Sequence, residues 1–185
     1  GVAGTGSPVV FEIENASLVL AGGIATITIN RPEVRNSVRP KTYEELTAAM
    51  HQAAGDPEIG VVVLTGTGDK AFCSGGDVRD QQTRVPDVGR VHMRRLFALS
   101  SAMRMMDKPI IAKVRGFCVG GGVALAVALD FRVMARDAHM RVPEIGLGMN
   151  MSWQSVPRML HLMGPARTKQ AVILADQRIS ATEAY

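Results

Sequence analysis

The stretch GFCVGGGVALAVALDFRV (residues 116–133) places three consecutive glycines directly before a segment that has no polar side chain until Asp130. A glycine run between a strand and a helix lets the backbone adopt positive φ and lets a ligand approach the main chain without meeting a Cβ atom. The first N–H groups of the helix that follows are unpaired and lie at the positive end of its dipole. The turn can therefore donate to a negative oxygen, although the same glycines could serve only to pack the helix closely on a sheet.

Regular elements are expected on both sides of this turn. Apolar alternation and β-branched runs predict strands at residues 9–14, 17–21, 24–29, 60–66, 109–114 and 131–135. Helical spacing predicts helices at residues 40–53, stopped by Gly55, and at residues 91–106. Further helices are predicted from the glycines to Leu129, from Pro165, and from a capping box at Ser180 and Glu183. Strands that alternate with helices indicate an α/β fold with parallel pairing.

Length and composition restrict the class of protein. A chain of 185 residues with 46% hydrophobic and 21% charged residues is typical of one globular domain, expected here at residues 9–185 after a flexible tail at residues 1–8. A net charge of +4 with only 4% aromatic residues argues against a nucleic-acid partner, and no apolar run is long enough to span a membrane. Cys73 and Cys118 lack metal-ligand spacing, which favours a cytoplasmic protein without a metal site.

A second glycine turn lies in TGTGDKAFCSGGDVRD (residues 65–80), which also follows an apolar strand. Its adjacent Gly75 and Gly76 could aim backbone donors at the same point as the first turn. The glycines and alanine of residues 66–71 also fit a lone G-x-G-x-x-A dinucleotide pattern, but that pattern needs a helix to begin there. A helix cannot comfortably run through Ser74 and the two glycines, so we favour two converging donor turns.

Four segments, in this order, resemble the enoyl-CoA hydratase/isomerase (crotonase) superfamily. They are ITINRPEVRNS (residues 27–37), LTGTGDKAFCSGGD (64–77), MDKPIIAKVRGFCVGGGVALAVALDFRV (106–133) and RVPEIGLG (141–148). The resemblance implies a crotonase-like spiral of ββα units, with the C-terminal helical part missing from this chain, and assembly as homotrimers or dimers of trimers. It also implies an acyl-CoA substrate, and no cofactor apart from the coenzyme A of that substrate.

The resemblance further implies which residues form the site. The backbone N–H groups of Gly76 and Gly121 would hold the thioester oxygen, and Glu144 would act as the base. The position of a second carboxylate in the family pattern falls on Ala124 in this chain. The residues implied to line the CoA thioester are Val34, Arg35, Ser74, Asp77, Val78, Arg79, Gly120 and Pro143.

The residue types that are present limit the reaction. Two preorganised donors stabilise the enolate that forms when a proton leaves the carbon beside a thioester. Addition of water is easiest with two carboxylates, whereas moving a double bond needs one base, so a lone Glu144 favours isomerisation. A hydratase that uses Glu144 alone and a non-catalytic acyl-CoA-binding protein stay open as alternatives. Glu144 could also be only a helix-start or surface charge, and Trp153 and Gln154 could narrow the pocket or add a polar contact.

Overall fold

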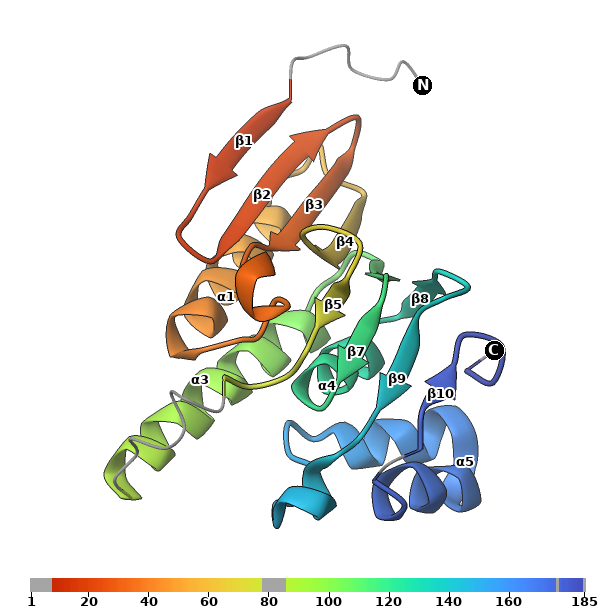
Figure 1. The fold of residues 1–185 in the computed structure, drawn as a ribbon. Coiled ribbons are helices and arrows are strands. Elements are labelled where there is room, and N and C mark those ends of the chain that lie inside the picture. The colour runs from red at the N-terminus through yellow and green to blue at the C-terminus, as the bar shows by residue number, and fades with distance from the viewer. Residues whose placement is uncertain (1–7, 78–85, 176, 185) are drawn as a thin grey trace.

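A computed structural model describes residues 8–77, 86–175 and 177–184, which form two β-sheets with helices packed against them (Figure 1). The larger sheet has six strands in the order β1-β2-β3-β4-β6-β8. They are β1 Val9–Glu12, β2 Ala16–Ala21, β3 Ile24–Ile29, β4 Val61–Gly66, β6 Ile110–Val114 and β8 Phe131–Met134. The first three pair antiparallel and the last four pair in parallel, which confirms the predicted meander and the predicted α/β sheet.

Helix α1 Pro40–Gly55 connects β3 to its parallel neighbour β4, a connection that requires a crossover. The helix begins at Pro40, where the missing N–H would have no acceptor within the helix. Tyr43, Leu46 and Met50 on one face of α1 are at most 1% exposed and belong to the main hydrophobic core. Helix α3 Pro86–Arg104 packs beside α1 and begins earlier than the predicted helix at residues 91–106.

A second, four-stranded sheet has the order β10-β9-β7-β5 and lies in the lower half of Figure 1. Its strands are β5 Ala71–Cys73, β7 Phe117–Val119, β9 His139–Arg141 and β10 Ile179–Ser180. Strands of three residues or fewer are too short to show a period of two, so the sequence did not predict this sheet. Because β5 is a strand where the dinucleotide pattern needs a helix, the dinucleotide interpretation is wrong.

Helix α4 Gly121–Ala128 follows β7 directly, as the glycine run predicted, and helix α5 Ser155–Ile173 packs against it. α5 is interrupted at Gly164, which has φ 75° and ψ 171°. Pro165 does start a helical segment, but the segment before Gly164 was not predicted. Ser180 and Glu183 form the predicted capping box: the Glu183 N–H donates to the Ser180 hydroxyl, and the Ser180 N–H donates to the Glu183 carboxylate. The helix that the box was predicted to open is absent, since residues 181–184 form a turn. In the described ranges, no helix is both long enough and apolar enough to cross a membrane.

Candidate active site

The two glycine turns lie against each other at one edge of the smaller sheet. β5 and β7 are parallel neighbours, with Cys73 opposite Cys118, so the chain leaves both strands at the same edge. A Cβ atom added at Gly121 would lie 3.5 Å from the Gly76 nitrogen, and one added at Gly75 would lie 3.4 Å from the Gly121 nitrogen. The fold therefore brings the Gly76 and Gly121 amides together from segments far apart in the sequence.

The Gly76 amide points toward that contact because Val38 fixes the backbone on its other side. The Val38 N–H donates to the Gly75 carbonyl at 2.9 Å, and the Val38 carbonyl accepts from the Asp77 N–H at 2.9 Å. Successive N–H groups of extended backbone point to opposite edges. The Gly76 N–H therefore faces away from Val38 and toward Gly121, and none of the described residues accepts a hydrogen bond from it.

The three consecutive glycines have different roles. Gly120 precedes α4 with φ 55° and ψ −115°, a backbone conformation that favours glycine. Gly121 is the first residue of α4, so its N–H has no acceptor within the helix. A Cβ atom added at Gly122 would lie 2.3 Å from the Cys73 carbonyl oxygen, so this glycine lets α4 pack closely on β5. The close-packing interpretation is therefore confirmed for Gly122, whereas the donor interpretation stays a prediction for Gly121.

The Glu144 carboxyl lies beside the same turn. Glu144 begins the short helix η2 Glu144–Leu147, and its Oε1 atom is 3.0 Å from the position that a Cβ atom at Gly120 would take. Its Oε2 atom is buried and has no hydrogen-bond partner in the described part of the chain. Burial raises the pKa of this carboxyl, against a smaller lowering effect of its own backbone N–H. Glu144 is thus a helix-start residue but not a solvated surface charge.

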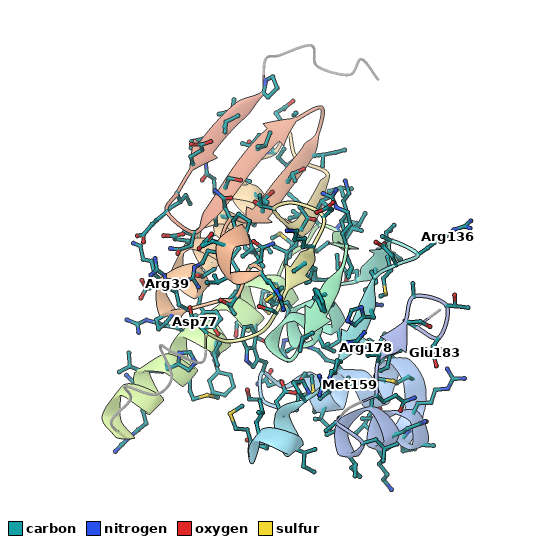
Figure 2. The ribbon with its side chains drawn as sticks, in the orientation of Figure 1. Arg39, Asp77, Arg136, Met159, Arg178 and Glu183 are labelled. Atoms are coloured by element: carbon teal, nitrogen blue, oxygen red, sulfur yellow. The ribbon has the colours of Figure 1, made fainter. Side chains whose placement is uncertain are left out.

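Asp77 (Figure 2), which was predicted to line the CoA thioester, forms an ion pair with Arg31. The Arg31 Nη2 atom lies 3.1 Å from the Asp77 Oδ2 atom, and the two side chains are 11% and 15% exposed. Arg31 Nη1 also donates to the Ser37 carbonyl at 2.8 Å, and the Asn36 side chain accepts from the Arg31 N–H. This network fixes the backbone beside Gly76. Sequence reasoning missed Arg31 and Asn36 because a polar side chain that will be buried in a network carries no periodic signal.

Three other residues that were predicted to line the CoA thioester lie next to one another. The Ser74 N–H donates to the Arg35 carbonyl at 3.1 Å, and the Ser74 hydroxyl donates to the Val34 carbonyl at 3.2 Å. The Arg35 guanidinium lies over the Phe117 ring, 5.3 Å from its centroid. Arg35 and Lys70 line a shallow cavity of about 210 Å³ beside this segment. Val34, Arg35 and Ser74 therefore lie together on the side of the Gly75 turn.

The remaining predicted residues divide into two groups. Pro143 lies near the first turn, since a Cβ atom at Gly120 would be 3.9 Å from its Cδ atom. Val78 and Arg79 lie outside the described residues. Among the residues that the structure describes, no group of three or more His, Cys, Asp or Glu side chains could hold a metal ion. Cys73 is fully buried, and burial raises the pKa of its thiol to about 12, which removes it as a candidate nucleophile at neutral pH.

Trp153 is the site residue whose role the sequence left open. Its Cζ2 atom is 3.4 Å from the position of a Cβ atom at Gly121, and the residue is 7% exposed. Its ring meets the Tyr43 ring edge-on, with centroids 5.1 Å apart. Gln154, in contrast, is exposed. Of the two residues, Trp153 is therefore the one that borders the donor turn.

Both the sequence and the fold are similar to those of known proteins. The sequence pattern of the enoyl-CoA hydratase/isomerase family matches residues 20–185. The chain is 32% identical over 177 residues to a short-chain-enoyl-CoA hydratase of Clostridium acetobutylicum, and 35% identical over 176 residues to a crotonyl-CoA hydratase of Syntrophomonas wolfei. These alignments cover 94% and 93% of this chain, which spans 66% of the length of either relative. The crystal structure of an enoyl-CoA hydratase from Bacillus anthracis superposes with a TM-score of 0.88 at 30% identity, covering 92% of this chain and 66% of that one.

Proposed function

The chain belongs to the enoyl-CoA hydratase/isomerase family, and we propose that it binds an acyl-CoA thioester and transfers a proton at the carbon beside the carbonyl group. The family resemblance drawn from four sequence motifs is confirmed by the family match and by the two relatives. One observation supports the proposed reaction above all others: Gly76 and Gly121 meet beside the Glu144 carboxyl.

In the proposed complex the thioester oxygen accepts hydrogen bonds from the Gly76 and Gly121 N–H groups. Glu144 takes a proton from the carbon beside the carbonyl group. The electron pair of the broken C–H bond forms a double bond to the carbonyl carbon, and the carbonyl oxygen becomes a negatively charged enolate oxygen. Backbone donors that the fold already holds in place stabilise this charge, and loss of one such donor costs about 10²- to 10³-fold in rate. The raised pKa of Glu144 suits a group that must both accept and return the proton.

Ala124 favours double-bond isomerisation as the overall reaction. It is 2% exposed and lies three residues after Gly121, on the same face of α4, where it offers no second carboxylate. With a 3-enoyl-CoA substrate, Glu144 alone can remove the proton beside the carbonyl and return it two carbons further along. The product is the conjugated 2-enoyl-CoA, and the reaction consumes neither water nor a cofactor.

Hydration is a second candidate, favoured by the names of the two relatives as hydratases. In that reaction Glu144 alone holds the water, whose oxygen adds to the carbon two positions from the carbonyl while the water proton reaches the carbon beside it. The two candidates share the donor pair and the base, and they differ in the substrate and in whether solvent oxygen enters the product.

A panel of 2-enoyl-CoA and 3-enoyl-CoA thioesters, incubated in ¹⁸O-labelled water, tests both candidates. Isomerisation yields the conjugated product without label, and hydration yields a hydroxyacyl product that carries it. The Glu144→Gln variant is expected to lose about 10²- to 10⁴-fold in rate. Glu183→Gln, which changes an exposed carboxylate, is the control and should keep the rate. Binding without turnover on every panel member would contradict both reactions and leave the non-catalytic alternative.

Two further properties stay predictions of the same proposal. Assembly as homotrimers or dimers of trimers can be tested by sedimentation. The absence of a cofactor requirement can be tested by turnover after exhaustive dialysis against a chelator.

A further inference from the structure

Trp153 occupies the space between the Gly121 turn and helix α1. Its Cζ2 atom lies 3.4 Å from the position that a Cβ atom at Gly121 would take, and its ring packs edge-to-face against the Tyr43 ring at an interplanar angle of 73°. The Tyr43 ring in turn packs edge-to-face against the ring of His92 in α3, with the ring centroids 5.3 Å apart. The indole is thus one end of a row of three rings and lies beside one of the two proposed donors.

The backbone at Trp153 is held in an unfavourable conformation. Trp153 and Gln154 both have positive φ, 66° and 55°, which non-glycine residues rarely adopt. The Arg158 Nη1 atom donates to the Trp153 carbonyl at 3.2 Å, and its Nη2 atom donates to the Ser100 hydroxyl of α3 at 3.1 Å. Backbone strain that neighbouring bonds maintain is concentrated at functional positions. The indole is therefore placed by contacts from α1, α3 and α5 together.

The two sides of the donor pair differ. On the Gly75 side, Ser74 donates hydrogen bonds to the carbonyl groups of Val34 and Arg35, two residues that are predicted to line the CoA thioester. On the Gly121 side stands the buried indole. If the thioester oxygen lies between the two amides and the CoA portion runs along Val34 and Arg35, the acyl carbons are expected on the opposite, Gly121 side, where Trp153 lies. Ala124, one turn after Gly121, leaves this face of α4 without a polar group that could compete for the space.

We infer that Trp153 closes the acyl end of the site and thereby restricts it to CoA thioesters with short acyl chains. The inference rests on the proposed function, since it takes the thioester oxygen between the Gly76 and Gly121 amides. It assigns to Trp153 a selection for chain length and no part in the proton transfer. The long acyl chains that the wild-type protein excludes should bind once the indole is removed.

Binding of acetyl-, butyryl-, hexanoyl- and octanoyl-CoA, measured by calorimetry on the whole chain, tests this inference. An apolar pocket gains roughly threefold to fourfold in affinity for each methylene that it buries. Wild-type affinity should stop rising after butyryl-CoA and fall at least about tenfold by octanoyl-CoA. In Trp153→Ala the rise should continue through octanoyl-CoA, with the affinity for free CoA unchanged, and Trp153→Phe should be intermediate.

Leu160→Ala is the matched control, because Leu160 is a 41% exposed apolar residue of the same helix that follows Trp153. It should keep the wild-type profile. Equal chain-length profiles for wild type and Trp153→Ala, with thioesters still bound, would overturn the inference and leave the proposed function intact. Failure of the wild-type protein to bind any thioester would overturn the proposed function and this inference with it.

A second measurement needs no variant. Trp153 is the one tryptophan among the 185 residues, so all tryptophan emission comes from this ring. Butyryl-CoA should change the intensity or wavelength of that emission, whereas free CoA, which lacks acyl carbons, should leave it nearly unchanged. Identical changes with butyryl-CoA and free CoA would contradict contact between the acyl group and the indole.

Discussion

The Glu144 carboxyl lies directly against Gly120: its Oε1 atom is 3.0 Å from the position that a Cβ atom of residue 120 would occupy. The residue that shapes the donor turn therefore also borders the proposed base. Any side chain at position 120 must displace the carboxyl, and the positive φ of Gly120 adds strain to the same substitution.

Gly120→Ala should consequently lower turnover by about tenfold or more, since small displacements of a catalytic group are costly. It should also destabilise the fold by about 1–2 kcal/mol through the positive φ. Gly22→Ala is the matched control, because Gly22 has a similar φ of 57° and open space around its Cβ position. Steady-state kinetics and urea unfolding should show a loss of stability in both variants and a loss of turnover only in Gly120→Ala. Equal turnover in both variants would contradict the contact with Glu144.

Gly122→Ala should destabilise the protein by about 3 kcal/mol, because the added Cβ atom would lie 2.3 Å from the Cys73 carbonyl oxygen, and backbone cannot move aside cheaply. Alanine ordinarily stabilises a helix relative to glycine. A loss of stability in Gly122→Ala would therefore come from the close contact with Cys73 and not from helix propensity. Gly55→Ala, at the end of α1 with no atom within 4 Å of its Cβ position, should be neutral or slightly stabilising. Chemical denaturation measures both, and a stable Gly122→Ala variant would show that α4 does not pack on β5 this closely.

Asp77→Ala should cost about 1–3 kcal/mol, because it leaves the largely buried Arg31 without its carboxylate partner. Turnover should fall more than substrate affinity, since the change lies next to the Gly76 amide. The exposed pair between Arg95 and Glu44 is the comparison, and Glu44→Ala should change stability by less than about 0.5 kcal/mol. If Asp77→Ala and Glu44→Ala both changed stability by equally small amounts, the inference that Arg31 supports the Gly76 turn would be contradicted.

Glu144→Gln should be at least as stable as the wild type near neutral pH. Burial raises the folded-state pKa of Glu144, so the folded state binds the proton more tightly than the unfolded state does. The stability that Glu144 contributes to the wild-type protein is therefore lost as pH rises from the unfolded-state pKa through the folded-state pKa. The difference in stability between Glu144→Gln and the wild type should consequently shrink at acid pH.

Glu183→Gln should show the opposite dependence, because hydrogen bonds from Ser180 lower the pKa of Glu183. Its contribution is present above the unfolded pKa and lost as pH falls, so this variant should be the less stable one at neutral pH and equal to wild type in acid. Thermal unfolding between acid and neutral pH compares the two variants. The same sign for both would contradict the burial of the Glu144 carboxyl.

Much of the fold could be predicted because its signals are local. The meander, α1 and the strands β4 and β6 combine periodicity or a continuous apolar run with glycine or proline at their ends, and α1 begins at the predicted Pro40. The smaller sheet could not be predicted, since its strands have three residues or fewer. The first half of α5 follows Trp153 and Gln154, which both have positive φ. Neither tryptophan nor glutamine favours positive φ, so the sequence does not indicate that a helix begins there.

The site was predictable only in part for a related reason. Gly76, Gly121 and Glu144 stand in motifs with family spacing, so their positions could be read from the sequence. Trp153 reaches the site through tertiary packing on Tyr43, and Arg31 reaches Asp77 across 46 residues of sequence. Contacts of this kind depend on how the elements pack, and a single sequence carries no pattern for them.

In the proposed reaction, two backbone amides hold a thioester oxygen while Glu144 moves the neighbouring proton. Exchange of the protons beside the carbonyl of butyryl-CoA in D₂O, followed by mass spectrometry, tests it without depending on the overall reaction. The wild-type protein should catalyse this exchange, and Glu144→Gln should bind butyryl-CoA yet exchange about 10²- to 10⁴-fold more slowly. Equal exchange by the variant, or binding by the wild-type protein without any exchange, would contradict the account.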